Sequence, residues 1–128
     1  MRSQAVFATV ASLAILSGAF AAPPSVARAE TEYLLGYIEA SGCDFYRNGS
    51  QYDAARAGAH LRDKYAAIGQ VATAEAFIDK VASRSSLSGQ PYEVSCAGQG
   101  RVMTAPWLRE ALARYRADRA PRDSRDAR

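Results

Sequence analysis

Four segments of the chain carry apolar residues every three or four positions, the spacing that places them on one face of a helix. The pattern predicts amphipathic helices over about residues 32–41, 53–68, 74–83 and 105–116. A threonine stands at the expected N-cap of three of them: Thr31, Thr73 and Thr104. Gly42 and Gly69 follow the first two segments and are typical helix stops.

The segments between these helices predict a small amount of β-structure. Aromatic residues in 43–52 flank Asn48-Gly49, the dipeptide that most favours a tight hairpin turn. Residues 92–96 alternate apolar and polar, as a half-buried strand does, and a glycine-rich turn leads to a partner strand at 101–103. The expected fold class is therefore α+β, mostly α: about four amphipathic helices packed on a small antiparallel sheet formed by the hairpin and the strand pair.

The first 29 residues have the layout of a secretory signal peptide. A positive start at Met1-Arg2 precedes the uncharged stretch 5–22, and Ala27-Arg28-Ala29 supplies small residues for cleavage. We expect cleavage after Ala29, with an earlier alternative after Ala21. A membrane anchor is the competing interpretation, but the stretch is short and contains Thr, Ser and Gly. We therefore expect no stable membrane insertion once the signal is removed.

Cleavage after Ala29 leaves one small domain over 30–117 and a charged tail over 118–128, which we expect to be disordered. Arg2 and Arg28 leave with the signal, so the net charge falls from +3 to +1. A nucleic-acid-binding protein would gather its basic residues into a stripe. Acids and bases alternate here, so we expect no nucleic-acid partner and, by default, a monomer.

The two cysteines, Cys43 and Cys96, both follow the signal segment. In an oxidising compartment such a pair is typical of one structural disulfide. The competing interpretation is a reactive or metal-binding pair. However, the sequence contains neither a Cys-x-x-Cys motif nor more than one histidine. We therefore expect a structural disulfide, no metal site and no cofactor.

His60 is the one side chain suited to proton transfer at neutral pH. No zinc-protease motif, phosphate-binding loop or nucleophile elbow is present. On the helix 53–68, Arg56 lies one turn before His60 and Lys64 one turn after it. These cations disfavour the imidazolium, so His60 is a candidate base. The interpretation that we favour is a half-buried histidine that hydrogen-bonds the hairpin or the serine-rich loop 83–89.

The serine-rich loop is the second candidate for chemistry. Its hydroxyls and Arg84 could hold an anion or a sugar, whereas the simpler interpretation is a polar loop whose hydroxyls cap neighbouring structure. Our predicted ligand-binding face consists of Arg47, Asn48, His60, Arg84, Ser85 and Ser86. A catalytic alternative uses His60 as general base with Ser85 or Ser86. A carboxylate pair acting on a glycan is a further alternative, drawn from Glu39, Asp44 and Glu93.

Several short motifs together resemble a known family. They are Ser41-Gly42-Cys43-Asp44-Phe45, Arg47-Asn48-Gly49 with Tyr52, His60-Leu61 with Lys64, the loop 82–92, and Trp107-Leu108-Arg109 with Tyr115-Arg116. This pattern is similar to the YfeK-like small exported bacterial proteins of unknown function, over about residues 32–116. The resemblance implies a periplasmic location in a Gram-negative bacterium and a one-domain fold. It implies no activity and no catalytic residue.

The sequence thus predicts a non-enzymatic periplasmic domain that binds a protein or another envelope component. The alternative is a small hydrolase that acts on an envelope component with His60 as general base.

Overall fold

The computed structural model describes residues 24–120. Its elements are, in order, α1 (Pro24–Ala40), β1 (Asp44–Arg47), β2 (Ser50–Tyr52), α2 (Ala54–Ile68), α3 (Ala74–Phe77), the π-helix η1 (Ile78–Ala82), β3 (Glu93–Ser95), β4 (Val102–Met103) and α4 (Thr104–Arg119). Most of the expected signal segment, and the expected tail from residue 121, lie outside the described part. Within 24–120, no helix is long and apolar enough to cross a membrane.

The hairpin and the later strand pair form one antiparallel sheet in the order β2-β1-β3-β4, which confirms the predicted α+β fold class. Asn48 and Gly49 have φ angles of 50° and 79°. Two consecutive positive φ values are what a type I′ turn requires, and they explain why this dipeptide closes the hairpin. The register places Phe45 of β1 between Tyr52 and Val94.

Helix α2 begins and ends at the residues that the sequence indicated. The Asp53 carboxylate accepts a hydrogen bond from the Arg56 N–H at 2.8 Å, which satisfies one free donor of the first turn. Gly69 has a φ of 67° and ends the helix, with its N–H bonded to the Tyr65 carbonyl. This helix carries His60 and packs against both α1 and β1.

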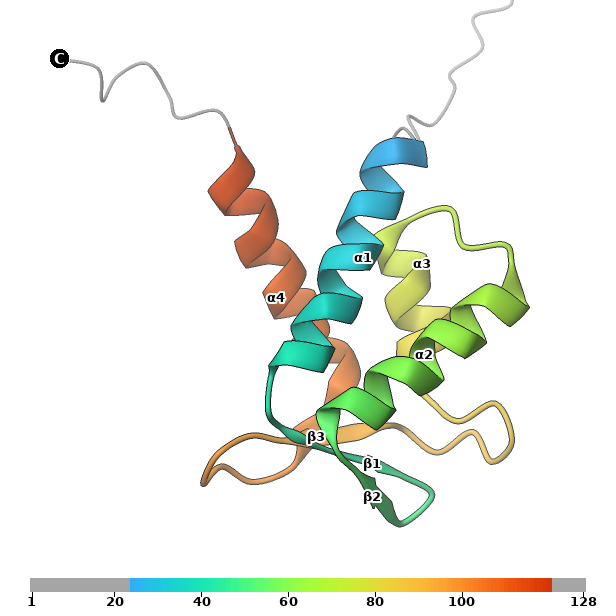
Figure 1. Ribbon diagram of the computed structural model, residues 1–128, viewed down its shortest axis with the longest axis vertical. Helices are drawn as coiled ribbons and strands as arrows, with labels where there is room; N and C mark the ends of the chain where they lie inside the picture. Colours follow the sequence, from blue (N-terminus) through green and yellow to red (C-terminus); the bar gives the residue numbers. More distant parts are fainter. Residues whose placement is uncertain (1–23, 121–128) are drawn as a thin grey trace, which may run out of the picture.

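The helices stand on one side of the sheet (Figure 1). Helices α1 and α4 pack against each other and run in opposite directions, so the start of α1 and the end of α4 lie together at the end farthest from the sheet (Figure 1). The core between the helices and the sheet is formed by fully buried side chains that include Leu34, Ile38, Phe77, Val94 and Leu108.

Helix α1 begins at Pro24, so the predicted start near residue 32 was wrong. Its first turns bury Ala27, and Glu30 is only 5% exposed. The Arg116 guanidinium on α4 binds the Glu30 carboxylate through two hydrogen bonds, at 2.5 and 2.9 Å. Because the partner of Glu30 is 86 positions away, the local pattern of apolar residues could not predict that the helix starts this early. A cut after Ala29 would remove the first turns of this helix, whereas a cut after Ala21 would leave it whole.

Two further boundaries differ from the prediction. The segment predicted as one helix over 74–83 is the short α3 followed by η1. The sequence pattern does not distinguish the two helix types, because the buried residues Phe77, Ile78, Val81 and Ala82 share a face in either of them. Helix α4 extends to Arg119, so the first two residues of the predicted tail are helical.

Thr104 is the first residue of α4 and not its N-cap, which is Met103. The Thr104 N–H donates to the Tyr92 carbonyl at 2.9 Å, so the backbone here is still held beside the segment that leads into β3. The predicted capping role of Thr104 was therefore wrong, and its hydroxyl is left without a capping partner.

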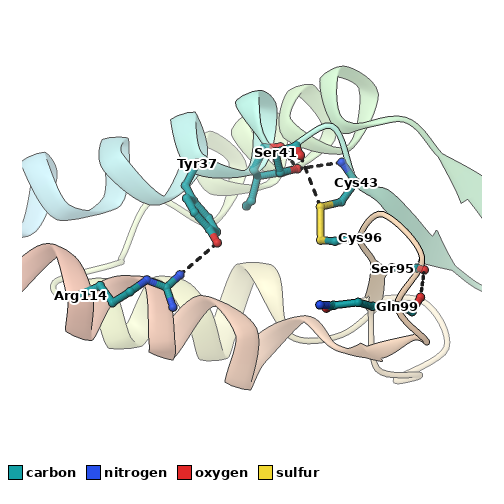
Figure 2. Close-up of a disulfide and its surroundings, with 8 residues drawn as sticks. Tyr37, Ser41, Cys43, Ser95, Cys96, Gln99 and Arg114 are labelled. Carbon is teal, nitrogen blue, oxygen red and sulfur yellow. Dashed lines mark hydrogen bonds between the residues drawn. A yellow bond between two sulfur atoms is a disulfide. The ribbon is translucent and has the colours of Figure 1, made fainter.

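Cys43 and Cys96 form the predicted disulfide (Figure 2). The bond ties the start of the hairpin to the residue that follows β3, so it fastens the sheet below the end of α1. Ser41 supports this junction, since its Oγ donates to the Ile38 carbonyl at 2.7 Å and accepts from the Cys43 N–H at 3.2 Å. Closing a loop with a sequence separation of 53 should stabilise the fold by about 4 kcal/mol on the chain-entropy model.

Candidate functional site

A cavity of about 290 Å³ lies between the hairpin and α2. One wall is apolar and aromatic, with Phe45 and Tyr52 from the hairpin facing Ala57 and Leu61 from α2. The other side chains that line it are polar or charged: Tyr46, Arg47, Arg56, His60, Asp63, Tyr92 and Thr104. The cavity therefore offers both an apolar surface and a concentrated set of polar groups, which is the usual composition of a small-ligand site.

Arg47 and His60 meet inside this cavity. Arg47 lies two residues after Phe45 on β1, so both side chains point to the face of the sheet that α2 covers. The Arg47 Nη1 atom is 2.9 Å from His60 Nε2 and 3.3 Å from His60 Nδ1. A guanidinium can only donate, so the ring nitrogen that it binds must be unprotonated. This confirms the interpretation of His60 as a half-buried histidine that bonds the hairpin.

Burial lowers the pKa of His60, and the neighbouring charges of Arg47 and Lys64 lower it further, while Asp63 opposes them. The ordinary histidine pKa of 6.5 is already below neutral pH, so His60 is neutral at pH 7. It can accept a hydrogen bond or a proton there, but it supplies no positive charge until the solution is more acidic.

Tyr92 and Lys64 extend this network. The Tyr92 hydroxyl is 3.5 Å from His60 Nε2, and Lys64 Nζ donates to it at 3.3 Å. Lys64 also donates to the Arg84 carbonyl at 2.7 Å. Burial raises the pKa of Tyr92 and lowers the pKa of Lys64, the latter helped by Arg47. Tyr92 is therefore a protonated hydroxyl at neutral pH, held between an ammonium group and an imidazole.

The charge inside the cavity is positive. Both Arg47 and Arg56 lie over the Tyr52 ring, with Cζ atoms 5.5 and 5.8 Å from its centroid. Among residues 24–120, neither of these arginines nor Lys64 forms a salt bridge with a carboxylate. Asp63 is the one acidic residue of the lining. An excess of cations in a partly desolvated cavity favours an anionic occupant.

Two polar atoms of the lining have no hydrogen-bond partner. In the described part of the chain, the buried side-chain nitrogens and oxygens that lack one are Arg47 Nε and Thr104 Oγ1. Thr104 is 1% exposed. Leaving a buried donor unpaired costs about 1–3 kcal/mol, so such groups are rare and call for an explanation.

The predicted ligand-binding residues divide into three groups. Arg47 and His60 line the cavity. Asn48 and Ser85 bind each other: Asn48 Nδ2 donates to Ser85 Oγ at 3.1 Å, and the same oxygen accepts from the N–H groups of Leu87 and Ser88. They fasten the serine-rich loop to the hairpin turn. Arg84 and Ser86 are exposed and do not line the cavity.

The catalytic alternatives find little geometric support. Within 24–120, no serine hydroxyl forms a hydrogen bond with His60, and Ser85 is occupied by its own loop. Of the three candidate carboxylates, Glu39 pairs with Arg62 on α2. The other two, Asp44 and Glu93, lie on adjacent strands and do not line the cavity. The described residues also contain no group of three His, Cys, Asp or Glu side chains able to hold a metal ion.

Several residues that line or adjoin the cavity were not predicted as part of the ligand-binding face. Arg56 and Lys64 were noted as neighbours of His60, and their one-turn spacing was the available signal. Tyr52 was assigned only to the hairpin and Tyr92 only to a strand. Thr104 was predicted only as a helix N-cap, and nothing in the sequence indicated a place in the cavity, which it reaches through the pairing of its backbone with Tyr92.

The family model of DUF5329, a family of unknown function, matches residues 25–116, a span that includes the whole cavity lining. The uncharacterized protein YfeK of Salmonella typhimurium strain LT2 is 49% identical over 49 residues, which are 38% of this chain and 41% of that relative. The match therefore spans less than half the length of that relative. No solved structure matches the chain. Since the family model covers most of the sequence, the chain belongs to DUF5329, a family whose function is unknown.

Proposed function

We propose that this protein is a non-enzymatic binding domain of the bacterial envelope and that its ligand occupies the cavity between the hairpin and α2. The observation that carries the proposal is the convergence of Arg47, His60 and Tyr92 on one cavity of about 290 Å³ with an aromatic wall. Lys64 adjoins this group through its hydrogen bond to the Tyr92 hydroxyl. This volume suits a small molecule or the end of a larger envelope component.

We favour binding over hydrolysis because the side chains that a hydrolase would need, His60 and Ser85, are bonded to other groups. A general base needs a nucleophile or a water in reach. The His60 ring instead accepts from Arg47, and Ser85 is held by Asn48 and its own loop. These contacts orient groups for recognition. They do not pair His60 with a serine nucleophile among the described residues.

Export is part of the proposal, and α1 bears on the cleavage site. The signal pattern supports export, and the disulfide is compatible with an oxidising compartment such as the periplasm. Because Ala27 and Glu30 are buried in α1, we propose cleavage after Ala21 and not after Ala29. Mass spectrometry of the exported protein should then find Ala22 at the N-terminus. Glu30 at that position would refute this choice.

The test of binding is capture of envelope components by the immobilised protein, with mass spectrometry of what is retained. In His60→Trp the larger indole fills part of the cavity, so retention should fall at least tenfold. Ala59→Trp is the matched control, since Ala59 is an exposed neighbour on α2 that does not line the cavity. Arg56→Glu, at an exposed position of the lining, is a second probe that should leave folding intact.

Equal retention by wild type, His60→Trp and Arg56→Glu would refute the cavity as the binding site. Conversion of the retained compound to a cleaved product by wild type, but not by His60→Ala, would refute the non-enzymatic assignment and support the hydrolase alternative. Circular dichroism of each variant should show the wild-type unfolding transition.

A further inference from the structure

The two unpartnered buried atoms, Arg47 Nε and Thr104 Oγ1, belong to residues that line the same cavity. The Arg47 atom is a donor only, and the Thr104 hydroxyl can donate. Every other buried side-chain nitrogen and oxygen in residues 24–120 has a partner. These two unsatisfied groups belong to side chains that line one cavity, one from β1 and one from the start of α4, and an acceptor bound in the cavity is the kind of group that would satisfy them.

The long helix α4 adds to this preference. Its first residue is Thr104, so the positive end of its dipole lies at this side of the cavity, although the Thr104 N–H itself is bonded to the Tyr92 carbonyl. Its N-cap residue, Met103, makes no side-chain capping bond. The helix end, the unpartnered hydroxyl and the cations of Arg47 and Arg56 all belong to residues that line the cavity, and each favours negative charge there.

We infer that the cavity binds a small organic oxyanion, a molecule whose carboxylate or phosphate group is held by Arg47 and Thr104 and whose apolar or ring-shaped body packs on Phe45, Tyr52 and Leu61. The inference rests on the proposed binding function and names its ligand class. The cavity volume exceeds what an inorganic ion needs, and the aromatic wall would contribute nothing to one. The body of the ligand is therefore part of what is recognised.

Binding should be coupled to protonation of His60. The charged and titratable groups around His60 are Arg47 from β1, Arg56, Asp63 and Lys64 from α2, and Tyr92 from the segment before β3. An oxyanion among these cations offsets their repulsion of the imidazolium and moves the pKa of His60 upward. Affinity should therefore rise as the pH falls toward the ordinary histidine pKa of 6.5 and below it.

The experiment uses isothermal calorimetry on the disulfide-bonded protein with four probes: benzoate, phenyl phosphate, benzyl alcohol and inorganic phosphate. Benzoate or phenyl phosphate should bind at least tenfold more tightly than the neutral alcohol, and the tighter of the two identifies the head group. Inorganic phosphate should bind at least tenfold more weakly than phenyl phosphate. Added salt should weaken anion binding, because the attraction is electrostatic.

Thr104→Val tests the oxyanion contact by removing the hydroxyl while keeping the shape of the side chain. It should weaken binding of the anions roughly tenfold, the loss expected for one hydrogen bond to a charged group. It should not lower the unfolding temperature, because it replaces an unpartnered buried hydroxyl. Thr104→Ser, which keeps the hydroxyl, should retain affinity. Arg114→Gln is a charge control on the same helix, since Arg114 pairs with Glu110 and does not line the cavity.

Benzyl alcohol binding as tightly as benzoate would refute the oxyanion class and leave the cavity as a binding site. Failure of both anions to bind at their solubility limits would also refute the class. A neutral compound retained by wild type and lost in His60→Trp would do the same while supporting the proposed function. Inorganic phosphate as tight as phenyl phosphate would refute recognition of an organic body.

Discussion

Charged side chains gather at two opposite ends of the helical layer, and their partners differ. Toward the far end of the helices, Arg116 of α4 binds Glu30 of α1 and Glu75 of α3 at 2.5 to 2.9 Å. At the sheet end, Arg47 and Lys64 line or adjoin the cavity without a carboxylate partner in the described chain. The ion pairs of Arg116 therefore join three helices, whereas the positive charges of Arg47 and Lys64 are not neutralised by a carboxylate of the described residues and can attract an anion.

The pKa values show the same difference. The two carboxylates raise the pKa of Arg116, and hydrogen bonding from Arg116 lowers the pKa of Glu75, so Arg116 and Glu75 each favour the charged form of the other. In the cavity, burial and the charge of Arg47 lower the pKa of both His60 and Lys64, so the groups disfavour one another. A charge cluster that opposes its own ionisation contributes little to folding, which is compatible with the proposed anionic ligand.

A disulfide stabilises the sheet end, whereas the ion pairs of Arg116 stabilise the far end. Removing the disulfide should have the largest effect on stability. The disulfide holds the sheet end, so Cys43→Ser together with Cys96→Ser should lower the free energy of unfolding by about 4 kcal/mol. Chemical denaturation measures the loss. Hydrogen exchange should show that amides of β1 and β3 lose protection before those at the end of α4. Unchanged stability would mean that the bridge does not constrain the fold.

The far end should depend on Glu30. Glu30→Gln removes one side of an ion pair whose carboxylate is buried and whose guanidinium is half exposed. The free energy of unfolding should fall by about 2 kcal/mol, less than for a fully buried pair because solvent reaches Arg116. Glu32→Gln is the control: its pair with Arg62 is exposed on both sides and should be worth below about 1 kcal/mol. Equal losses would remove the distinction between the two pairs.

The elements could be predicted from sequence where the signal is local. The hairpin follows from two residues with positive φ, and α2 follows from a capping Asp53 and a terminal Gly69. The disulfide followed from the number of cysteines and the expected compartment. Each of these features is determined by residues close together in the chain or by a count.

The start of α1 and most of the cavity could not be predicted, because they depend on distant partners. Glu30 is helical and buried through its pairing with Arg116, 86 positions away. Thr104 reaches the cavity because its backbone pairs with Tyr92. Arg47 and His60 were both chosen as candidates, but their contact depends on which face of β1 packs against α2.

Acid should destabilise the two ends over different pH ranges. The folded-state pKa of His60 lies below its ordinary 6.5, so the unfolded chain takes up its proton first and stability falls as the pH drops below 6.5. The folded-state pKa of Glu75 also lies below its ordinary 4.5, so stability falls again as the pH drops below 4.5. Denaturation across this range measures both losses. His60→Gln should abolish the first and Glu75→Gln should reduce the second.

If His60→Gln leaves the loss between 6.5 and 4.5 unchanged, the cavity is not the source of that instability. A rise in stability on acidification over the same range would contradict the direction assigned to the pKa of His60.

The smallest change in stability should come from the arginine that lacks a carboxylate. Arg47→Gln loses the hydrogen bond to His60 but relieves repulsion among Arg47, His60 and Lys64, so the free energy of unfolding should change by less than about 1 kcal/mol. Arg116→Gln, the matched change at the other end, should cost about 2 kcal/mol because it leaves Glu30 buried without its partner.

Arg47→Gln should also raise the pKa of His60 and lower the affinity for the anion. Without Arg47 the imidazolium is less disfavoured, so the pKa of His60 should rise toward 6.5, as measured by NMR titration of the ring. Affinity for benzoate should fall at the same time, because the main cation of the cavity is lost. A stability loss as large as that of Arg116→Gln, or an unchanged pKa of His60, would mean that Arg47 is a structural residue like Arg116. Both charge clusters would then serve to stabilise the fold, and they would differ only in which residues they pair with.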